Sequence, residues 1–184
     1  MTKKYVEENL VNLVRARPII IVVTLHPTGI PNAGTFGAYT NVSDSQIGIA
    51  IGRASHTYKN IKTTGQLTIN VVTKSIANAA EICGRNIPEN ESEIEKAGLT
   101  CEVSKKVSPP IIKESVANIE CRFVQEIEIN YHCFMIVQCI AGHIEENCIS
   151  NNGGLDVVKA EAIFEIGYPE PVYAVLSHAF RVEI

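Results

Sequence analysis

The sequence predicts a mainly β fold, a β-barrel with short helical insertions. Residues 18–25 ("PIIIVVTL") form a run of β-branched residues, which favour strands. Residues 66–72 alternate in the way that a half-buried strand does. Residues 116–129 and 132–147 are longer strand patterns separated by only two residues, which predicts two strands joined by a tight connection. Six or seven strands are expected in all.

Ahead of the first strand, the apolar residues Val6, Leu10 and Leu13 recur at helical spacing. They predict a short N-terminal helix over about residues 4–15. Pro18 ends it, because a proline disfavours helical backbone in the residue before it.

The strand at 18–25 is apolar throughout, so we expect it to be buried on both faces. Turn residues follow it at 26–29. The segments 30–43 and 46–52 then complete three strands with short turns, which suggests an antiparallel meander, sheet or barrel.

A short helix is predicted over residues 58–64, with Thr57 as its N-cap and Gly65 just past its end. The polar, acidic segment 85–100 is expected to be a solvated loop with one helical turn around residues 91–97. Because no repeat or linker divides the chain, residues 1–184 are expected to form a single domain.

Composition excludes several classes of partner. The net charge of −4 and the lack of a Lys/Arg stripe argue against a nucleic-acid groove. The longest apolar run is too short to cross a bilayer, and the N-terminus lacks the features of a signal peptide. We therefore expect a cytoplasmic protein that binds neither nucleic acid nor membrane.

The six cysteines show no C-x-x-C pair and no Cys/His cluster with metal-ligand spacing, so no metal site is predicted. Several lie in apolar stretches such as "HCFMIVQCIAG", where a reduced cysteine behaves as a small buried hydrophobe. Their lack of paired spacing counts against a disulfide- or metal-based redox role.

Polar residues gather where a strand gives way to a helix, in "GRASHTYKNIKTTG" (52–65). Ser55 and Thr57 precede the helix, and Arg53 carries a planar fork of donors. Hydroxyls and unpaired first-turn N–H groups at this position suit a phosphate. An ordinary helix cap needs the same residue types, so both interpretations stay open.

The preceding segment, "NAGTFGAYTNVSDS" (32–45), is rich in small residues. Ala33, Gly34, Gly37 and Ala38 leave room for a flat heterocycle to approach the backbone. A bulged or sharply coiled barrel corner also requires glycine and is the alternative.

Taken in order, these segments resemble the flavin reductase-like family, whose members have an FMN-binding split-barrel fold. The family patterns "T-x-S-x-x-x-x-V-S", "R-x-S-x-T-x-x-N-I" and "G-x-F-x-x-N" correspond to "NAGTFGAYTNVSDS", "IGIAIGRASHTYKNI" and "GQLTINVV". The resemblance covers nearly the whole chain from about residue 16. The chain departs from the family at Gly37 and Ala38, where Ser or Trp is common, at Leu67, which replaces Phe, and at residues 44–46, where "DSQ" replaces "DPP".

The resemblance implies an FMN site made from both segments. Four residues would line the isoalloxazine ring: Thr35, Phe36, Gly37 and Ala38. Three would hold the phosphate: Arg53, Ser55 and Thr57. Asn32 and Asn60 are implied as further contacts or as supports.

His132 begins a long strand, and family members often have a histidine in this region near the nicotinamide side of the flavin. A strand-end histidine that faces solvent is the equal alternative. No G-x-G-x-x-G motif is present, so a nicotinamide would have to bind over the flavin itself.

The resemblance implies a flavoprotein that passes electrons from NAD(P)H or a protein donor to flavin, ferric iron or a partner. It also implies a homodimer with FMN near the interface. The alternatives are a flavoredoxin-like carrier without NAD(P)H activity, and a non-redox ligand-binding module on the same barrel.

Overall fold

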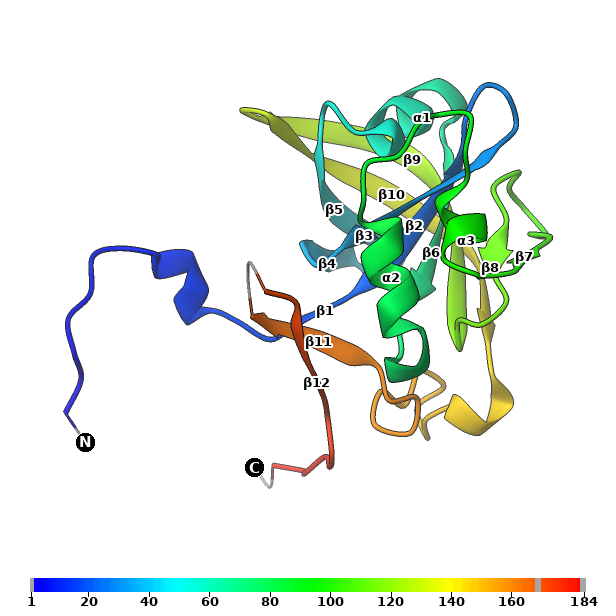
Figure 1. Ribbon diagram of the computed structural model, residues 1–184. Coiled ribbons are helices and arrows are strands. Elements are labelled where there is room, and N and C mark those ends of the chain that lie inside the picture. The colour runs from blue at the N-terminus through cyan, green and yellow to red at the C-terminus, as the bar shows by residue number, and fades with distance from the viewer. Residues whose placement is uncertain (1, 168–169, 183–184) are drawn as a thin grey trace.

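The computed structural model describes residues 2–167 and 170–182, and its main body is a curled seven-stranded sheet (Figure 1). In sheet order the strands are β3 (Pro31–Phe36), β2 (Ile20–Leu25), β6 (Gln66–Val71), β9 (Ala117–Ile129), β10 (His132–Ile144), β5 (Gln46–Gly52) and β4 (Tyr39–Ser43). Every neighbouring pair is antiparallel. The prediction of a mainly β, barrel-like fold is confirmed.

Smaller elements flank this sheet. A three-stranded sheet consists of β1 (Arg17–Pro18), β11 (Ile163–Gly167) and β12 (Val172–Val175), and β7 (Cys101–Glu102) pairs with β8 (Ile111–Ile112). The helices are α1 (His56–Thr64), α2 (Ala77–Cys83) and α3 (Glu93–Lys96), with 3₁₀ turns at Leu10–Leu13, Lys74–Ile76 and Glu146–Cys148. Strand β11 was not predicted from the sequence.

Strand β2 separates two hydrophobic cores. Ile20 and Val22 belong to the cluster inside the barrel, whereas Ile21 and Val23 belong to the cluster beneath α2 and α3. All four side chains are almost wholly buried. Because alternate residues of a strand face opposite sides, an uninterrupted apolar run is what such a strand requires. The prediction that it is buried on both faces is confirmed.

The segment 30–43 is not one strand. It breaks at Gly37 and Ala38 into β3 and β4, which lie at opposite edges of the seven-stranded sheet. Since only two residues join these edges, the sheet must curl round to bring them together. Gly37 suits this corner because a Cβ there would lie 3.0 Å from Ile19 Cδ1. The meander is therefore wrong, and the barrel is the alternative that the structure adopts.

The N-cap of α1 is Ser55 rather than Thr57. Ser55 has an extended backbone, and its Oγ accepts a hydrogen bond from the Tyr58 N–H at 3.2 Å, whereas Thr57 lies within the helix. Both residues are hydroxyl-bearing, so residue type alone could not separate them. Gly65 ends the helix in the left-handed region with φ 66°, as predicted.

The predicted N-terminal helix over residues 4–15 is wrong. Only a 3₁₀ turn forms, at Leu10–Leu13, and its apolar side chains are exposed, with Leu13 at 70%. Figure 1 shows this segment extending away from the barrel. A short helix is marginal unless its apolar face packs against something, and here that face meets no surface.

A buried carboxylate anchors the loop that leads into β8. Glu120 of β9 is fully buried, and its oxygens accept hydrogen bonds from the N–H groups of Lys105, Lys106 and Val107 at 2.9, 2.5 and 3.1 Å. His143 Nε2 lies 2.7 Å from the same carboxylate. Burial by itself would raise the pKa of Glu120, but these hydrogen bonds outweigh it and lower the pKa from 4.5 to about 2.

Replacing this carboxylate should make stability less dependent on pH. Since the folded pKa is depressed, the contribution of Glu120 is present above 4.5 and is lost as the pH falls toward about 2. We expect Glu120→Gln to lower the free energy of unfolding by about 2 kcal/mol near neutral pH, and by progressively less in acid. Urea unfolding at several pH values measures this.

Glu146→Gln, at an exposed glutamate, is the matched control and should change little at any pH. A Glu120→Gln deficit that is the same in acid as near neutral pH would contradict the linkage.

Candidate functional site

Two cavities meet between β3, α1 and α2. The first has a volume of about 320 Å³ and the second about 500 Å³, and Thr35, Phe36 and Gly84 line both. Each falls within the roughly 300–1,000 Å³ typical of small-molecule pockets. The two hollows thus form one elongated site with Thr35 and Phe36 at its middle.

The N-terminus of α1 forms one end of this site, where Ser55, His56 and Thr57 line the first cavity. The Ser55 hydroxyl already has two partners, because it donates to the Gly52 carbonyl at the end of β5 at 2.8 Å and accepts from the Tyr58 N–H of α1. As in any helix, the first-turn N–H groups of His56 and Thr57 have no intrahelical acceptor. They and the helix dipole favour an anion at this end.

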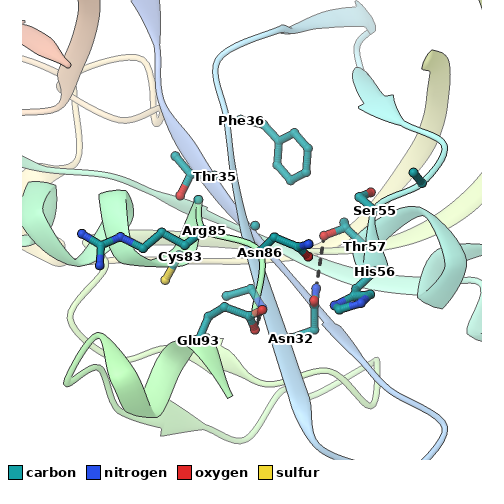
Figure 2. Close-up of a pocket in the computed structure, with 14 residues that line it drawn as sticks. Asn32, Thr35, Phe36, Ser55, His56, Thr57, Cys83, Arg85, Asn86 and Glu93 are labelled. Carbon is teal, nitrogen blue, oxygen red and sulfur yellow. Dashed lines mark hydrogen bonds between the residues drawn. The ribbon is translucent and has the colours of Figure 1, made fainter. Parts of the chain in front are cut away.

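A buried hydrogen-bond network fixes α1 against the sheet. Asn32 Nδ2 donates to Thr57 Oγ1 at 3.1 Å, the contact drawn in Figure 2, and to Thr24 Oγ1 at 3.0 Å. Asn60 Nδ2 donates to the same Thr24 oxygen at 3.1 Å. All four side chains are buried. Asn60 lies behind the cavity wall and acts as a support, while Asn32 both supports Thr57 and lines the cavity.

Gly34 allows the close contact between β3 and α1. A Cβ at this position would lie 2.8 Å from Thr57 Oγ1 and 2.9 Å from the Phe36 ring. The neighbouring Thr35 hydroxyl donates to the Ala80 carbonyl of α2 at 2.5 Å. Strand β3 is therefore held on one side by α1 and on the other by α2.

The second cavity lies at the barrel corner. Gly37, Ala38 and His132 line it, together with two pairs of polar side chains, Arg17 with Glu165 and Tyr173 with Glu81. The Tyr173–Glu81 pair connects the three-stranded sheet to α2, whereas Arg17 and Glu165 both belong to that sheet. Burial, followed by the bond to Glu81, raises the pKa of the Tyr173 phenol, so this group stays a donor at neutral pH.

A model of the flavin reductase like domain matches residues 15–157. The chain belongs to the flavin reductase-like family. A protein of Aquifex aeolicus is 27% identical over 165 residues, which cover 86% of this chain and 84% of that protein.

Solved structures share the split barrel of this family. A protein with a split barrel domain from Shewanella frigidimarina superposes with a TM-score of 0.85 at 21% identity, covering 97% of this chain and 94% of that one. Flavoredoxin of Desulfovibrio vulgaris (Miyazaki F) gives 0.85 at 21% identity, covering 99% and 97%. At such identities the likeness establishes the fold.

The structure brings most of the predicted site residues together. Asn32, Thr35, Phe36, Ser55 and Thr57 line the first cavity. The second cavity is lined by Thr35 and Phe36 again, and by Gly37, Ala38 and His132. Thr35 and Ser55 line the same cavity, as a site made from the segments 32–45 and 52–65 requires (Figure 2).

Arg53 lies apart from this set. Its side chain is 42% exposed and pairs with Glu128 of β9 at 3.3 Å, and it lines neither cavity. Arg85, in the loop after α2, does line the first cavity, although Figure 2 shows its side chain running away from Ser55 and Thr57. Asn86 points toward Thr57 in the same view.

Sequence analysis missed the groups that α3 and the loop before it supply. Glu93 is only 3% exposed, its Oε2 accepts a hydrogen bond from the Ala33 N–H at 3.0 Å, and it lines the first cavity. The helical turn predicted there does form, but the expectation that this acidic segment is solvated is wrong at Glu93. The sequence could not predict that Glu93 is buried, because its hydrogen-bond partner is a backbone amide sixty positions away, and every residue except proline carries such an amide.

Two imidazoles meet at the N-terminus of α1, where His56 is the first helical residue. The His26 and His56 rings pack edge to face with centroids 5.2 Å apart, and His56 Nε2 lies 3.5 Å from Glu89. Burial, and then the nearby His56, lower the pKa of His26, so His26 is neutral at physiological pH.

Over residues 2–167 and 170–182, no group of three or more His, Cys, Asp or Glu side chains is arranged to hold a metal ion. In that same part of the chain, no helix is long and apolar enough to span a membrane.

Adding one methyl group at Gly34 should disturb the site. We expect Gly34→Ala to lower the free energy of unfolding by about 1–3 kcal/mol, because its Cβ must displace the Thr57 hydroxyl or the Phe36 ring. Chemical denaturation of the purified chain measures the change.

Gly142→Ala is the matched control in another strand, since the nearest atom to its Cβ would be the Asn118 carbonyl oxygen at an ordinary 3.7 Å. Equal effects of the two substitutions would show that Gly34 is not a point of close approach.

Proposed function

We propose that the elongated site binds FMN and that the protein is an FMN-dependent oxidoreductase. The observation that carries this is the junction at Thr35 and Phe36, which joins a helix N-terminus suited to an anion with a second hollow at the barrel corner. A ligand with a phosphate at one end and a flat ring at the other has the matching shape. Bound FMN would supply the electron and hydride chemistry.

In this proposal the phosphate meets the N–H groups of the first turn of α1, with the Ser55 and Thr57 hydroxyls beside it. Thr35, Phe36, Gly37 and Ala38 orient the ring and exclude water from one side of it. Arg53 can join the phosphate by leaving Glu128, because an exposed ion pair contributes only about 0–1 kcal/mol.

FMN is favoured over FAD by the charge of the first cavity. The buried Glu93 carboxylate lines it opposite the N-terminus of α1, and Glu89 pairs with His56 at its edge. A second phosphate near these carboxylates would meet like charge, which is destabilising.

NAD(P)H is the proposed electron donor, with its nicotinamide over the flavin ring near His132, and flavin or ferric iron is the proposed acceptor. The second candidate is an electron carrier that exchanges electrons with a protein partner, in line with the flavoredoxin among the structures that share the fold. The third candidate is a non-redox module that uses the pocket for another phosphorylated ligand.

We further propose that the protein is a cytoplasmic homodimer with FMN near the interface. The exposed apolar side chains of the N-terminal segment support this, because a second copy would cover them. Tyr5, Val11 and Val14 are each more than three-quarters exposed.

A charge placed at the start of α1 tests the phosphate position. Ala54 is exposed, lines the first cavity and immediately precedes the N-cap. We expect Ala54→Asp to weaken FMN binding roughly tenfold or more, since like charges about 4 Å apart repel by about 1–4 kcal/mol. Titration of the chain with FMN, followed by flavin fluorescence, measures the affinity.

The same variant should fold at least as well as wild type, because an acidic group near a helix N-terminus is stabilising. Ala54→Asn is the neutral control of matching size and should bind nearly normally. If wild type takes up no FMN, the flavoprotein proposal fails. If Ala54→Asp binds like Ala54→Asn, the phosphate lies elsewhere.

Anaerobic stopped-flow mixing of the FMN-loaded protein with NADH or NADPH tests the donor. We expect one of them to bleach the flavin absorbance, and His132→Ala to slow that step at least about fivefold by loosening the position of the nicotinamide. Tyr131→Ala, at a neighbouring side chain that is 88% exposed, is the control and should react normally. Bleaching by neither nucleotide would leave the protein-partner candidate.

A further inference from the structure

Two cysteines that lie far apart in the sequence face each other across the barrel wall. Cys121 of β9 and Cys139 of β10 are direct partners in the antiparallel register. Cys121 is fully buried in the barrel core, and Cys139 packs at the edge of the same cluster and is partly exposed. Both are free thiols, and both side chains point to the same face of the sheet.

The backbone hydrogen bonds show which kind of pair this is. The Cys139 N–H donates to the Ser45 carbonyl at 2.8 Å, away from β9. Phe123, which is two residues from Cys121 and so points the same way, donates its N–H to the Gly65 carbonyl at 2.9 Å, away from β10. Cys121 and Cys139 therefore form a non-hydrogen-bonded pair.

Such pairs are the closest in an antiparallel sheet, with Cα atoms about 4.5 Å apart. A disulfide needs Cα atoms about 4.4–6.8 Å apart. The two strands thus already hold the cysteines at a separation that a disulfide can span. In contrast, Cys101 lies opposite Ile112, and Cys133 lies opposite Glu128 and Ile51.

The two thiols are chemically unequal. The Cys121 thiol donates to the Ile119 carbonyl at 3.9 Å and stays buried, whereas Cys139 is partly exposed. The neighbouring Cys121 lowers the pKa of Cys139, although burial opposes this, and the neighbouring Cys139, together with burial, raises the pKa of Cys121. Because the thiolate is the nucleophile, the partly exposed Cys139 is the better attacking group and the buried Cys121 the better second partner.

We propose that Cys121 and Cys139 form a reversible dithiol–disulfide site that hydrogen peroxide oxidises. The Cys139 thiolate attacks one peroxide oxygen, the O–O bond breaks, and hydroxide leaves and takes up a proton to become water. Cys139 is now a sulfenic acid. The Cys121 sulfur then attacks the Cys139 sulfur, the S–O bond breaks, and a second water leaves with the Cys121 proton. Peroxide is reduced by two electrons, and the two thiols are oxidised to one disulfide.

This site is independent of the flavin cavity. Cys139 lies seven residues along β10 from His132, which lines the second cavity, and neither Cys121 nor Cys139 lines either cavity. The proposal can therefore fail or hold whether or not the chain binds FMN.

Peptide mapping of the full chain tests it. The protein carries Cys101→Ser, which removes the exposed thiol, and is treated with hydrogen peroxide, alkylated without reduction and digested. We expect a single cross-linked species that joins Cys121 to Cys139 and disappears on treatment with dithiothreitol. Cys83, Cys133 and Cys148, which are buried and lie opposite neither cysteine of this pair, should be recovered as reduced thiols after denaturation.

Two variants test the order of steps. Cys121→Ser should form no cross-link but should accumulate a Cys139 sulfenic acid that dimedone traps. Cys139→Ser should give neither product at this site. Circular dichroism confirms that each variant is folded. Recovery of both cysteines as free thiols in the peroxide-treated parent chain, or a cross-link from Cys121 to another cysteine, would overturn the proposal.

Discussion

The placement of α1 against β2 and β3 is the constraint on which the site depends. It rests on buried amides and hydroxyls, with Asn32 and Asn60 both donating to Thr24 and Asn32 also donating to Thr57. A buried polar group left without a partner costs about 1–3 kcal/mol, so this set is stable in one arrangement and costly in others. It therefore fixes where the free N–H groups of α1 point.

The same constraint explains why glycines stand in β3 and at the corner that follows it. Gly34 lets the Thr57 hydroxyl approach the strand, and Gly37 lets the chain turn past Ile19 to the other edge of the sheet. The two sequence interpretations of the segment 32–45, room for a ligand and a tight barrel corner, are thus not exclusive. The corner creates the second cavity, and the close approach at Gly34 defines the wall of the first.

Much of the fold could be predicted from the sequence, because strand patterns and turn residues are recognised from residues that are close together in the chain. The apolar run of β2 and the long β9–β10 pair need only neighbouring residues to be recognised. The N-terminal helix failed for the opposite reason, since periodicity at Val6 and Leu10 cannot say whether a surface exists to cover them. The N-cap was misplaced because Ser55 and Thr57 differ in backbone conformation and not in chemistry.

The remaining errors come from contacts between distant residues. Arg53 forms an ion pair with Glu128, and Glu93 accepts a hydrogen bond from the Ala33 N–H. Both contacts depend on strand register and packing, which the spacing of residues along the chain does not reveal. The cysteine pair is the clearest case, because Cys139 comes eighteen positions after Cys121 and yet the β9–β10 register places the two opposite each other. The bulge at Ile140, immediately after this pair, shifts the register from there on. Had that extra residue fallen before Cys139 instead, Cys121 would face a different side chain, and the two thiols would lie on opposite faces of the sheet.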